Sequence, residues 1–199
     1  MNAVRLAIPD VIRFEPRAFP DERGIFFESF NRSAFEAATG LSADFPQDNH
    51  SVSKKKEVLR GLHYQLPPHA QGKLVRVVRG AAFDVAVDIR KGSPSFGRWV
   101  GEVLTPKNRH QLWIPEGFAH GFLALADNTE FLYKTSRLYD KARERSILWN
   151  DADIGIDWPL VDAPIVIDKD AEAPGFVGRK RSSDGLARTG RVRIIRRSL

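Results

Sequence analysis

The chain of 199 residues contains no cysteine and only one methionine. The lack of cysteine excludes disulfide bonds, thiol nucleophiles and metal sites built from thiolates. No apolar stretch approaches the roughly 18 residues that a membrane-spanning helix needs, and the first ten residues show no signal-peptide pattern. With 42% hydrophobic and 28% charged residues, the composition is that of a globular protein. We therefore expect a cytoplasmic protein that has no membrane partner.

Positive charge is concentrated at one end of the chain. Residues 179–199 contain eight Lys or Arg side chains and one acidic side chain, Asp184, whereas the whole chain has 31 basic and 25 acidic ones. The rest of the chain is therefore close to neutral. We expect a single domain over residues 1–177 and a basic, flexible tail over residues 178–199. Because the tail lacks interleaved aromatic residues, we expect no specific binding to nucleic acid.

The middle of the chain has the patterns of short β-strands. Residues 73–79 and 83–89 are rich in β-branched residues, and in the second range apolar residues alternate with aspartates and an alanine, which is typical of a half-buried strand. Further strands are predicted at 99–104, 111–114 and 121–126, with Pro- and Gly-containing turns between them. Many short strands at near-regular spacing favour a sandwich or a barrel.

One helix is predicted early in the chain. Ser33 and Glu36 have the spacing of a capping box, Phe35 and Ala38 form an apolar stripe, and Gly40 is suited to end the helix. We interpret this helix as a packing element that covers an edge of a sheet.

Two of the five histidines lie in patterns that indicate chemistry. His120 ends the sequence Pro115-x-Gly117-x-x-His120, which resembles the second conserved motif of the cupin superfamily. Metal-binding cupins supply His-x-His and then a carboxylate from their first motif, whereas here His63 is followed by Gln65, and Lys73 stands where an acidic ligand would follow. A protonated lysine repels a metal ion, so we predict a metal-free site that is suited to anions.

Over residues 1–177 the chain resembles the dTDP-4-dehydrorhamnose 3,5-epimerase family. The matching segments occur in the order and at the spacing of that family: Arg23-Gly24-x-Phe26-x-Glu28, Gln47-Asp48-Asn49-His50-Ser51, Leu59-Arg60-Gly61-Leu62-His63-Tyr64-Gln65, Gly72-Lys73-Leu74-Val75, Asp84-Val85-Ala86-Val87-Asp88-Ile89-Arg90, Ile114-Pro115-Glu116-Gly117-Phe118-Ala119-His120-Gly121-Phe122, Tyr133-Lys134, Trp149-Asn150-Asp151, Ile156-Asp157-Trp158-Pro159 and Lys169-Asp170.

The resemblance implies a mostly-β, cupin-type jelly-roll barrel with a few short peripheral helices. It also implies an isomerase that needs no cofactor and inverts C3 and C5 of dTDP-4-dehydro-6-deoxy-D-glucose, the two carbons beside the C4 ketone. Members of the family form homodimers in which an early segment of one subunit reaches the site of the other.

Four catalytic residues follow from the resemblance. His63 is expected to be the general base, because histidine exchanges protons near neutral pH. Asp170 is expected to orient the imidazole, Tyr133 to be the acid on the opposite face of the sugar, and Lys73 to stabilise the enolate oxygen. Taken alone, Tyr133 would equally fit a core strand and Asp170 a surface carboxylate. The family commonly has a serine where this chain has Ile167, which leaves the hydrogen bonding around Asp170 open.

The resemblance also implies a nucleotide site. Arg23 and Arg60 are expected at the pyrophosphate, although isolated arginines more often form surface ion pairs. Gln47 and Asn49 carry amides that suit a pyrimidine edge, and Phe26 could stack on the base. The remaining expected binding residues are Glu28, Asp48, His120, Glu144 and Lys169.

Three alternatives stay open at this point. A related enzyme could epimerise only C3 or only C5 of a 4-keto sugar on the same scaffold. A metal-dependent cupin is disfavoured by the missing His-x-His. A binding module without activity would have no need for His63, Lys73 and Tyr133 together.

Overall fold

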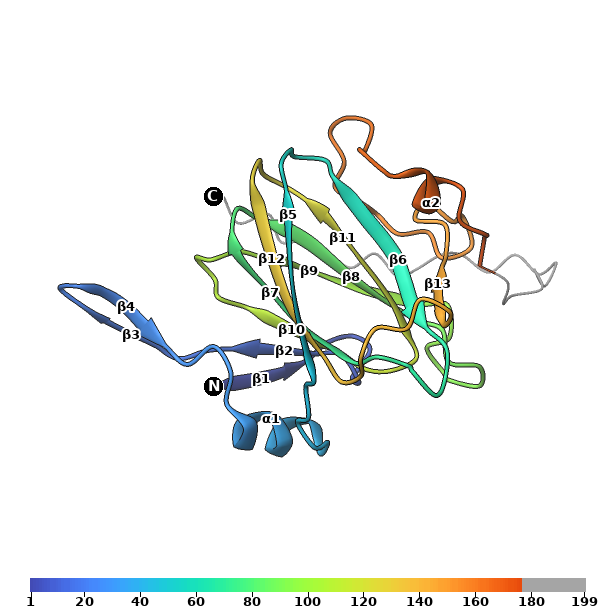
Figure 1. Cartoon of the computed structure of the whole chain (residues 1–199). Helices are drawn as coiled ribbons and strands as arrows, with labels where there is room; N and C mark the ends of the chain where they lie inside the picture. Colours follow the sequence, from blue (N-terminus) through green and yellow to red (C-terminus); the bar gives the residue numbers. More distant parts are fainter. Residues whose placement is uncertain (177–199) are drawn as a thin grey trace.

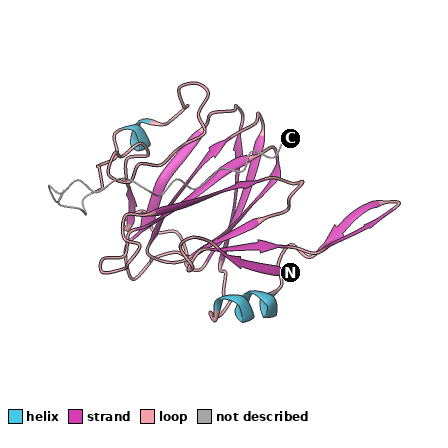
Figure 2. Ribbon diagram, turned by 180° about the vertical axis from the view of Figure 1, so that it is seen from behind, coloured by secondary structure: helices cyan, strands magenta, loops and turns pink. Residues whose placement is uncertain are grey.

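The structure is a computed structural model that describes residues 1–176. Strands dominate it, and the two helices lie at its periphery (Figure 2). The first sheet has six strands in the order β1 (Asn2–Arg5), β2 (Ile12–Glu15), β10 (Gln111–Ile114), β7 (Lys73–Arg79), β12 (Thr129–Thr135) and β5 (Gln47–Ser53). The second has five strands in the order β13 (Glu144–Ser146), β6 (Leu59–Gln65), β11 (Phe118–Ala124), β8 (Ala82–Asp88) and β9 (Trp99–Leu104).

The two sheets face each other and enclose an apolar core (Figure 1). All named strand pairs are antiparallel. In the core, Phe122 of the five-stranded sheet stacks on Phe131 of the six-stranded sheet, with ring centroids 4.1 Å apart. Removing such a buried ring costs about 3–5 kcal/mol. The arrangement confirms the predicted mostly-β, cupin-type fold.

The segment after β13 covers the outer face of the five-stranded sheet (Figure 1). Trp158 packs edge-on against Phe83 of β8, and Ile154 joins the same cluster. Every residue of β8 is consequently buried. The expectation of a half-buried strand was therefore wrong, because the alternating aspartates point into the protein and the apolar residues are covered by this segment.

The helix α1 (Arg32–Thr39) packs on the outer face of the six-stranded sheet. Phe35 is its buried residue and contacts Phe14 and Trp113. The predicted capping box does not form, since Asn31 is the N-cap and its side chain accepts a hydrogen bond from the amide of Ala34. The predicted end at a glycine is confirmed. The helix covers a face of the sheet and not an edge.

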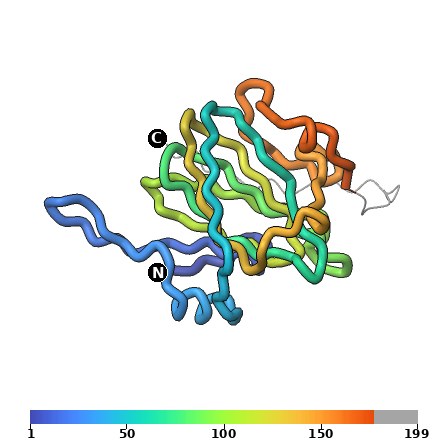
Figure 3. The backbone as a smooth tube through the Cα atoms, viewed as in Figure 1, coloured from blue at the N-terminus to red at the C-terminus, as the bar shows by residue number. Residues whose placement is uncertain are grey.

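A two-stranded hairpin, β3 (Ala18–Asp21) and β4 (Gly24–Phe27), projects away from the two sheets (Figures 1 and 3). Its strands pair only with each other, and Phe26 is 67% exposed. The hairpin is therefore an arm that the core of this chain does not cover.

Two glycines bring β6 and β11 unusually close. Gly61 has φ +127°, and a Cβ atom on it would lie 2.6 Å from the Cα atom of Gly121. No side chain fits at that crossing. The strand register there places His63 directly opposite His120. The expected domain boundary at residue 177 and the basic tail 178–199 lie outside the described residues, so both stay predictions.

Candidate active site

A cavity of about 300 Å³ lies between the two sheets, below the segment 165–167. Six elements contribute to its wall: β5, β6, β7, β11, β12 and α2 (Asp168–Ala171). A second hollow of about 210 Å³ adjoins it and shares His63, Lys73 and Tyr133 with it. The two hollows form one cleft with a deep half and an outer half. The four predicted catalytic residues all line the deep half.

The predicted pair of His63 and Asp170 is present. His63 lies on β6, Asp170 lies on the short helix α2 (Asp168–Ala171), and the Nε2 atom of the histidine is 2.7 Å from Oδ1 of the aspartate. The other carboxylate oxygen accepts a hydrogen bond of 3.1 Å from the backbone amide of Gly61. Burial acts to raise the pKa of Asp170, but these two hydrogen bonds outweigh it and lower the pKa. The pair leaves Nδ1 of His63 as the nitrogen available for proton transfer.

Tyr133 and Lys73 lie on neighbouring strands of the opposite sheet. The register pairs Tyr133 with Val75, so that Tyr133 and Lys73 occupy inward positions near the cavity. Burial raises the pKa of the tyrosine, and the nearby Arg60 partly opposes that rise. Protein surrounds most of Lys73, and this desolvation lowers its pKa to about 8, although Asp84 and Glu144 act in the other direction. Tyr133 and Lys73 thus face His63 from across the cavity.

A second His–Asp pair lies beside the first. The Nε2 atom of His120 is 2.7 Å from Oδ2 of Asp84, and both residues are buried. Burial lowers the pKa of His120 and raises that of Asp84. His120 lines the cavity, whereas Asp84 lies behind its wall.

The outer half of the cleft has polar walls. Glu144 accepts hydrogen bonds from the hydroxyl of Tyr139 at 3.0 Å and from the ammonium of Lys169. Gln47 donates to the side chain of Asn49 at 2.9 Å and accepts from the backbone amide of Tyr139 at 2.8 Å. These contacts fix two amides and an aromatic ring along one wall. Such a wall suits a planar polar ligand.

The chain has close relatives among characterised proteins and solved structures. The sequence profile of dTDP-4-dehydrorhamnose 3,5-epimerase matches residues 5–177. The chain belongs to the dTDP-4-dehydrorhamnose 3,5-epimerase family. It is 60% identical to the enzyme of that name from Shigella flexneri over 177 residues, covering 89% of this chain and 97% of the relative, and 58% identical to that of Pseudomonas aeruginosa over 176 residues, covering 88% and 96%.

Two solved structures in particular bear on the site of this family member. The dTDP-6-deoxy-D-glucose-3,5-epimerase of Legionella pneumophila, in complex with dTDP-4-keto-L-rhamnose, has 47% identity and a TM-score of 0.84, covering 87% of this chain and 92% of that one. A 3'-monoepimerase of Streptomyces bikiniensis, in complex with dTDP-quinovose, has 37% identity and a TM-score of 0.80, covering 85% of each chain.

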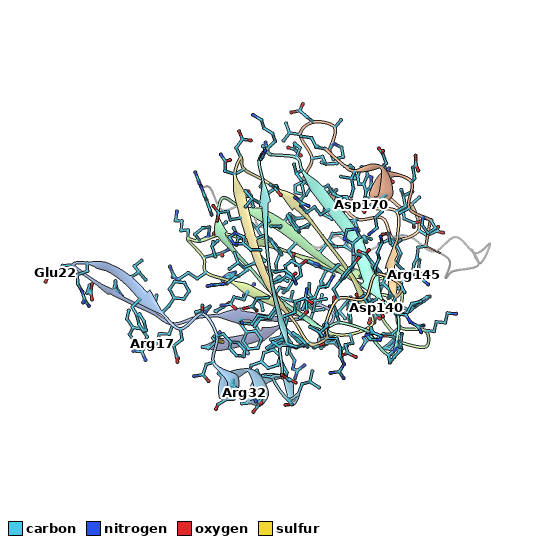
Figure 4. All side chains as sticks on the ribbon, in the orientation of Figure 1. Arg17, Glu22, Arg32, Asp140, Arg145 and Asp170 are labelled. Atoms are coloured by element: carbon cyan, nitrogen blue, oxygen red, sulfur yellow. The ribbon has the colours of Figure 1, made fainter. Side chains whose placement is uncertain are left out.

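Several binding residues implied by the family lie away from the cleft of their own chain. Arg23, Phe26 and Glu28 belong to the projecting arm or follow it, and Arg23 pairs with Asp21 at 2.6 Å. Figure 4 places Glu22 at the outer tip of the arm and Asp170 on the opposite side of the molecule. A single chain therefore does not bring the arm residues to its own site.

Asp48 also points away from the cleft. It lies on the outer face of the six-stranded sheet, where its carboxylate is 2.9 Å from the ammonium of Lys134. Arg60 is closer to its expected place, because its exposed side chain lines the deep half of the cleft.

Two residues, one that lines the cleft and one behind its wall, were missed in the sequence. Tyr139 lies in a loop with no strand or motif signal, and its contacts with Glu144 and Gln47 in the structure reveal its position. Asp84 was assigned to the polar side of a strand, although an aspartate within a run of Val and Ala was a signal of a buried carboxylate. Among residues 1–176 there is no cluster of three or more His, Asp or Glu residues placed to hold a metal ion. None of the described helices has the length and apolar character to cross a membrane.

Proposed function

We propose that the chain inverts C3 and C5 of dTDP-4-dehydro-6-deoxy-D-glucose and so forms dTDP-4-dehydro-L-rhamnose. The observation that carries this proposal is the placement of a base and an acid on opposite sheets of one cavity. His63, oriented by Asp170, lies on β6, and Tyr133 lies on β12. Inversion needs a proton removed from one face of a carbon and a proton delivered to the other face. The two walls of this cavity supply those two groups.

The chemistry of a 4-keto sugar suits these residues. Nδ1 of His63 takes the proton from the carbon beside the ketone, and the electron pair moves into an enolate whose oxygen is stabilised by the ammonium of Lys73. Tyr133 then donates its phenolic proton to the opposite face of the same carbon, and the ketone is restored. Proton exchange with solvent returns His63 to its neutral form and Tyr133 to its phenol before the second carbon reacts.

The donor set supports proton transfer without a metal ion. The Nε2 atoms of His63 and His120 are both held by aspartates, at 2.7 Å in each pair. The ammonium of Lys73 lies in the same cavity, and a cation there opposes the approach of a second cation. We therefore assign no metal and no cofactor to the reaction. A cytoplasmic location stays a prediction that rests on the lack of cysteine.

The outer half of the cleft is proposed to bind the nucleotide. Gln47, Asn49 and Tyr139 provide the polar and aromatic wall, and Glu144 holds the ammonium of Lys169, which provides positive charge for the pyrophosphate. Arg60 provides further positive charge from the wall of the deep half. His120 lines the deep half, where the sugar is proposed to lie.

We further propose a homodimer in which the arm of one chain completes the cleft of the other. Phe26, which is 67% exposed, and Arg23 on the arm have no ligand-binding role within their own chain. An exposed aromatic beside an arginine suits a base and a phosphate. A mixture of His63→Ala chains with chains that carry Arg23→Ala and Phe26→Ala tests the proposal. Exchanged dimers hold one complete site, so about a quarter of the parent activity should return. If the mixture is as inactive as its components, the arm does not act across the dimer.

The activity itself is tested by proton NMR of dTDP-4-keto-6-deoxyglucose with the enzyme in deuterated water, without added metal or nicotinamide. Deuterium should enter at both C3 and C5 of the product. His63→Ala should abolish the exchange, while His69→Ala, at a histidine outside the cavity that pairs with Asp140, should keep it. Folded parent protein that exchanges neither proton would contradict the proposal.

One second candidate has a specific observation in its favour. The similarity to the 3'-monoepimerase of Streptomyces bikiniensis extends over 85% of each chain. An enzyme of that kind would use the same base and acid at one carbon only. In the NMR experiment it would introduce deuterium at C3 and leave the C5 proton in place.

A further inference from the structure

Asp84 is a buried carboxylate of β8 with no assigned role. It has no exposed surface, and its Oδ1 atom has no hydrogen-bond partner among residues 1–176. Its Oδ2 atom is occupied by Nε2 of His120. An unpaired carboxylate oxygen in the interior is costly unless a positive charge lies near it. Besides His120, the charge of Lys73, which lines the same cavity as His120, acts to lower the pKa of Asp84.

The side chain of Lys73 also lacks a hydrogen-bond partner among the described residues. Its ammonium forms no ion pair within 4 Å and no hydrogen bond in the described part of the chain, although it is largely enclosed by protein. Desolvation favours the neutral amine, and the main opposing influence is the charge of Asp84. A neutral amine would be a weak partner for an enolate oxygen. The charge of Lys73 therefore depends on a residue that lies behind the wall of the cavity.

His120 links the same aspartate to the substrate side. A carboxylate at Asp84 accepts the hydrogen on Nε2 of His120, which leaves Nδ1 as an acceptor. His120 lines the cavity and Asp84 does not. One carboxylate thus governs two groups that face the sugar.

We propose that Asp84 is a positioning residue that keeps the Lys73 side chain as an ammonium and fixes the tautomer of His120. This role rests on the proposed function, because it matters only if an enolate forms at Lys73. In this role, Asp84 affects the reaction through Lys73 and His120 and does not itself contact the substrate.

Other ionisable groups also surround Lys73, and none of them replaces Asp84. Glu144 on β13 contributes a second negative charge but is already paired with Lys169 and Tyr139. The other ionisable groups that line the cavity are Arg60 and His63 on β6, His120 on β11, Tyr133 on β12 and Asp170 on α2. Of these, only Asp170 carries negative charge, and it is held by His63 and the amide of Gly61.

The first test is the pH dependence of kcat/KM for the Asp84→Asn variant. Asparagine keeps the shape and an acceptor for His120 but removes the charge and turns an amide donor toward Lys73. In the parent, activity should fall as the pH rises through the pKa of Lys73, about 8. In the variant that pKa drops further, so the alkaline midpoint should move down by about one pH unit or more. On the alkaline limb, this shift lowers kcat/KM about tenfold relative to the parent.

Asp88→Asn is the matched control, because Asp88 is a buried aspartate on the same strand that contacts Arg90, Ser93 and Ser95 and not the cavity. The folded Asp88→Asn protein should show the same alkaline midpoint in the pH dependence of kcat/KM as the parent. If Asp84→Asn also keeps that midpoint while the parent is active, the inference is overturned. An inactive parent would instead contradict the proposed function.

A second test does not depend on activity. Unfolding free energies are measured for the parent, Asp84→Asn, Lys73→Met and the double variant. Asp84→Asn should destabilise the parent more than it destabilises Lys73→Met. In the parent background the substitution leaves the buried cation of Lys73 without its partner, whereas Lys73→Met has no such cation. If Asp84→Asn alone fails to fold while the double variant folds, the substitution is again more destabilising in the parent than in Lys73→Met, as expected. Equal losses in both backgrounds would overturn the inference.

Discussion

The two His–Asp pairs of the cavity have the same bond length but different surroundings. Both nitrogen–oxygen distances are 2.7 Å, and the two histidines lie opposite each other in the strand register. Asp170 accepts a further hydrogen bond from the amide of Gly61, and its pKa is lowered. Asp84 has one oxygen without a hydrogen bond in the described chain, and its pKa is raised by burial.

This difference separates a base from a support. A carboxylate with two hydrogen bonds keeps its charge at neutral pH and is suited to stabilise an imidazolium at His63, as the proposed reaction requires. The fully buried pair of Asp84 and His120 disfavours a further charge, so His120 is poorly suited to accept a proton. The geometry of a pair does not define its role; the environment of the carboxylate does.

The largest expected effect comes from Asp170→Asn. An asparagine would turn its amide donor toward Nε2 of His63, which places the hydrogen of the ring on Nδ1, the nitrogen that should act as base. We expect kcat/KM to fall about a thousandfold, with the variant still folded. Steady-state kinetics and circular dichroism check this. A loss of less than tenfold in kcat/KM would mean that His63, oriented by Asp170, is not the base.

Tyr133→Phe should separate proton exchange from inversion. His63 would still remove a proton and return it on the same face, whereas delivery to the opposite face would lose its donor. We expect product formation to fall about a hundredfold or more, with solvent deuterium still entering unreacted substrate. Proton NMR in deuterated water measures both. Unchanged product formation would show that the acid lies elsewhere.

His120→Gln should have a smaller effect than changes at the first pair. Glutamine loses the acceptor that faces the sugar but creates no defect in the base. We expect about a tenfold loss of kcat/KM, consistent with one hydrogen bond to the substrate, and an unchanged acidic limb of the pH profile. If the loss equals that of His63→Ala, the two pairs have equivalent roles and the comparison fails.

Asp88→Asn should leave the chemistry intact and change only stability. Burial acts to raise the pKa of Asp88, but hydrogen bonds from Arg90, Ser93 and Ser95 outweigh it and lower the pKa below its usual 3.8. Its contribution to folding is thus present above that value and is lost as the pH falls below it. The variant should be about 1–3 kcal/mol less stable at pH 7 and show a weaker loss in acid. Urea unfolding at pH 7 and pH 3 measures the difference. A loss at pH 3 as large as at pH 7 would contradict this role.

Much of the fold could be predicted from the sequence. The strand 73–79 agrees with β7, 99–104 agrees with β9, and the range 83–89 is within one residue of β8. These strands have strong β-branched patterns bounded by turns. The burial of β8 on both sides could not be predicted, because it depends on a segment some 70 residues later that packs over Phe83. The cap of α1 was missed because Asn31 and Ser33 are both suitable N-caps in the sequence.

The site was predictable where residues act within recognisable motifs. The contact between His63 and Asp170 joins positions 107 residues apart, and only the family resemblance pointed to it. Tyr139 was missed because a loop residue has no periodic signal. The assignments of Arg23, Phe26 and Glu28 stay predictions, since they depend on a second chain.

The close crossing of β6 and β11 at Gly61 and Gly121 has a consequence for how this scaffold can vary. The separation of His63 and His120 is set by the contact between the backbones of β6 and β11, so changes in side-chain packing elsewhere do not readily alter it. In the proposed dimer, the walls that meet the sugar nucleotide come instead from the arm, the segment 165–167 and the loop around Tyr139. On the proposed function, the chemistry and much of the choice of sugar nucleotide are thereby carried by separate parts of the chain. New specificities can evolve by changes in loops while the proton-transfer centre is inherited intact.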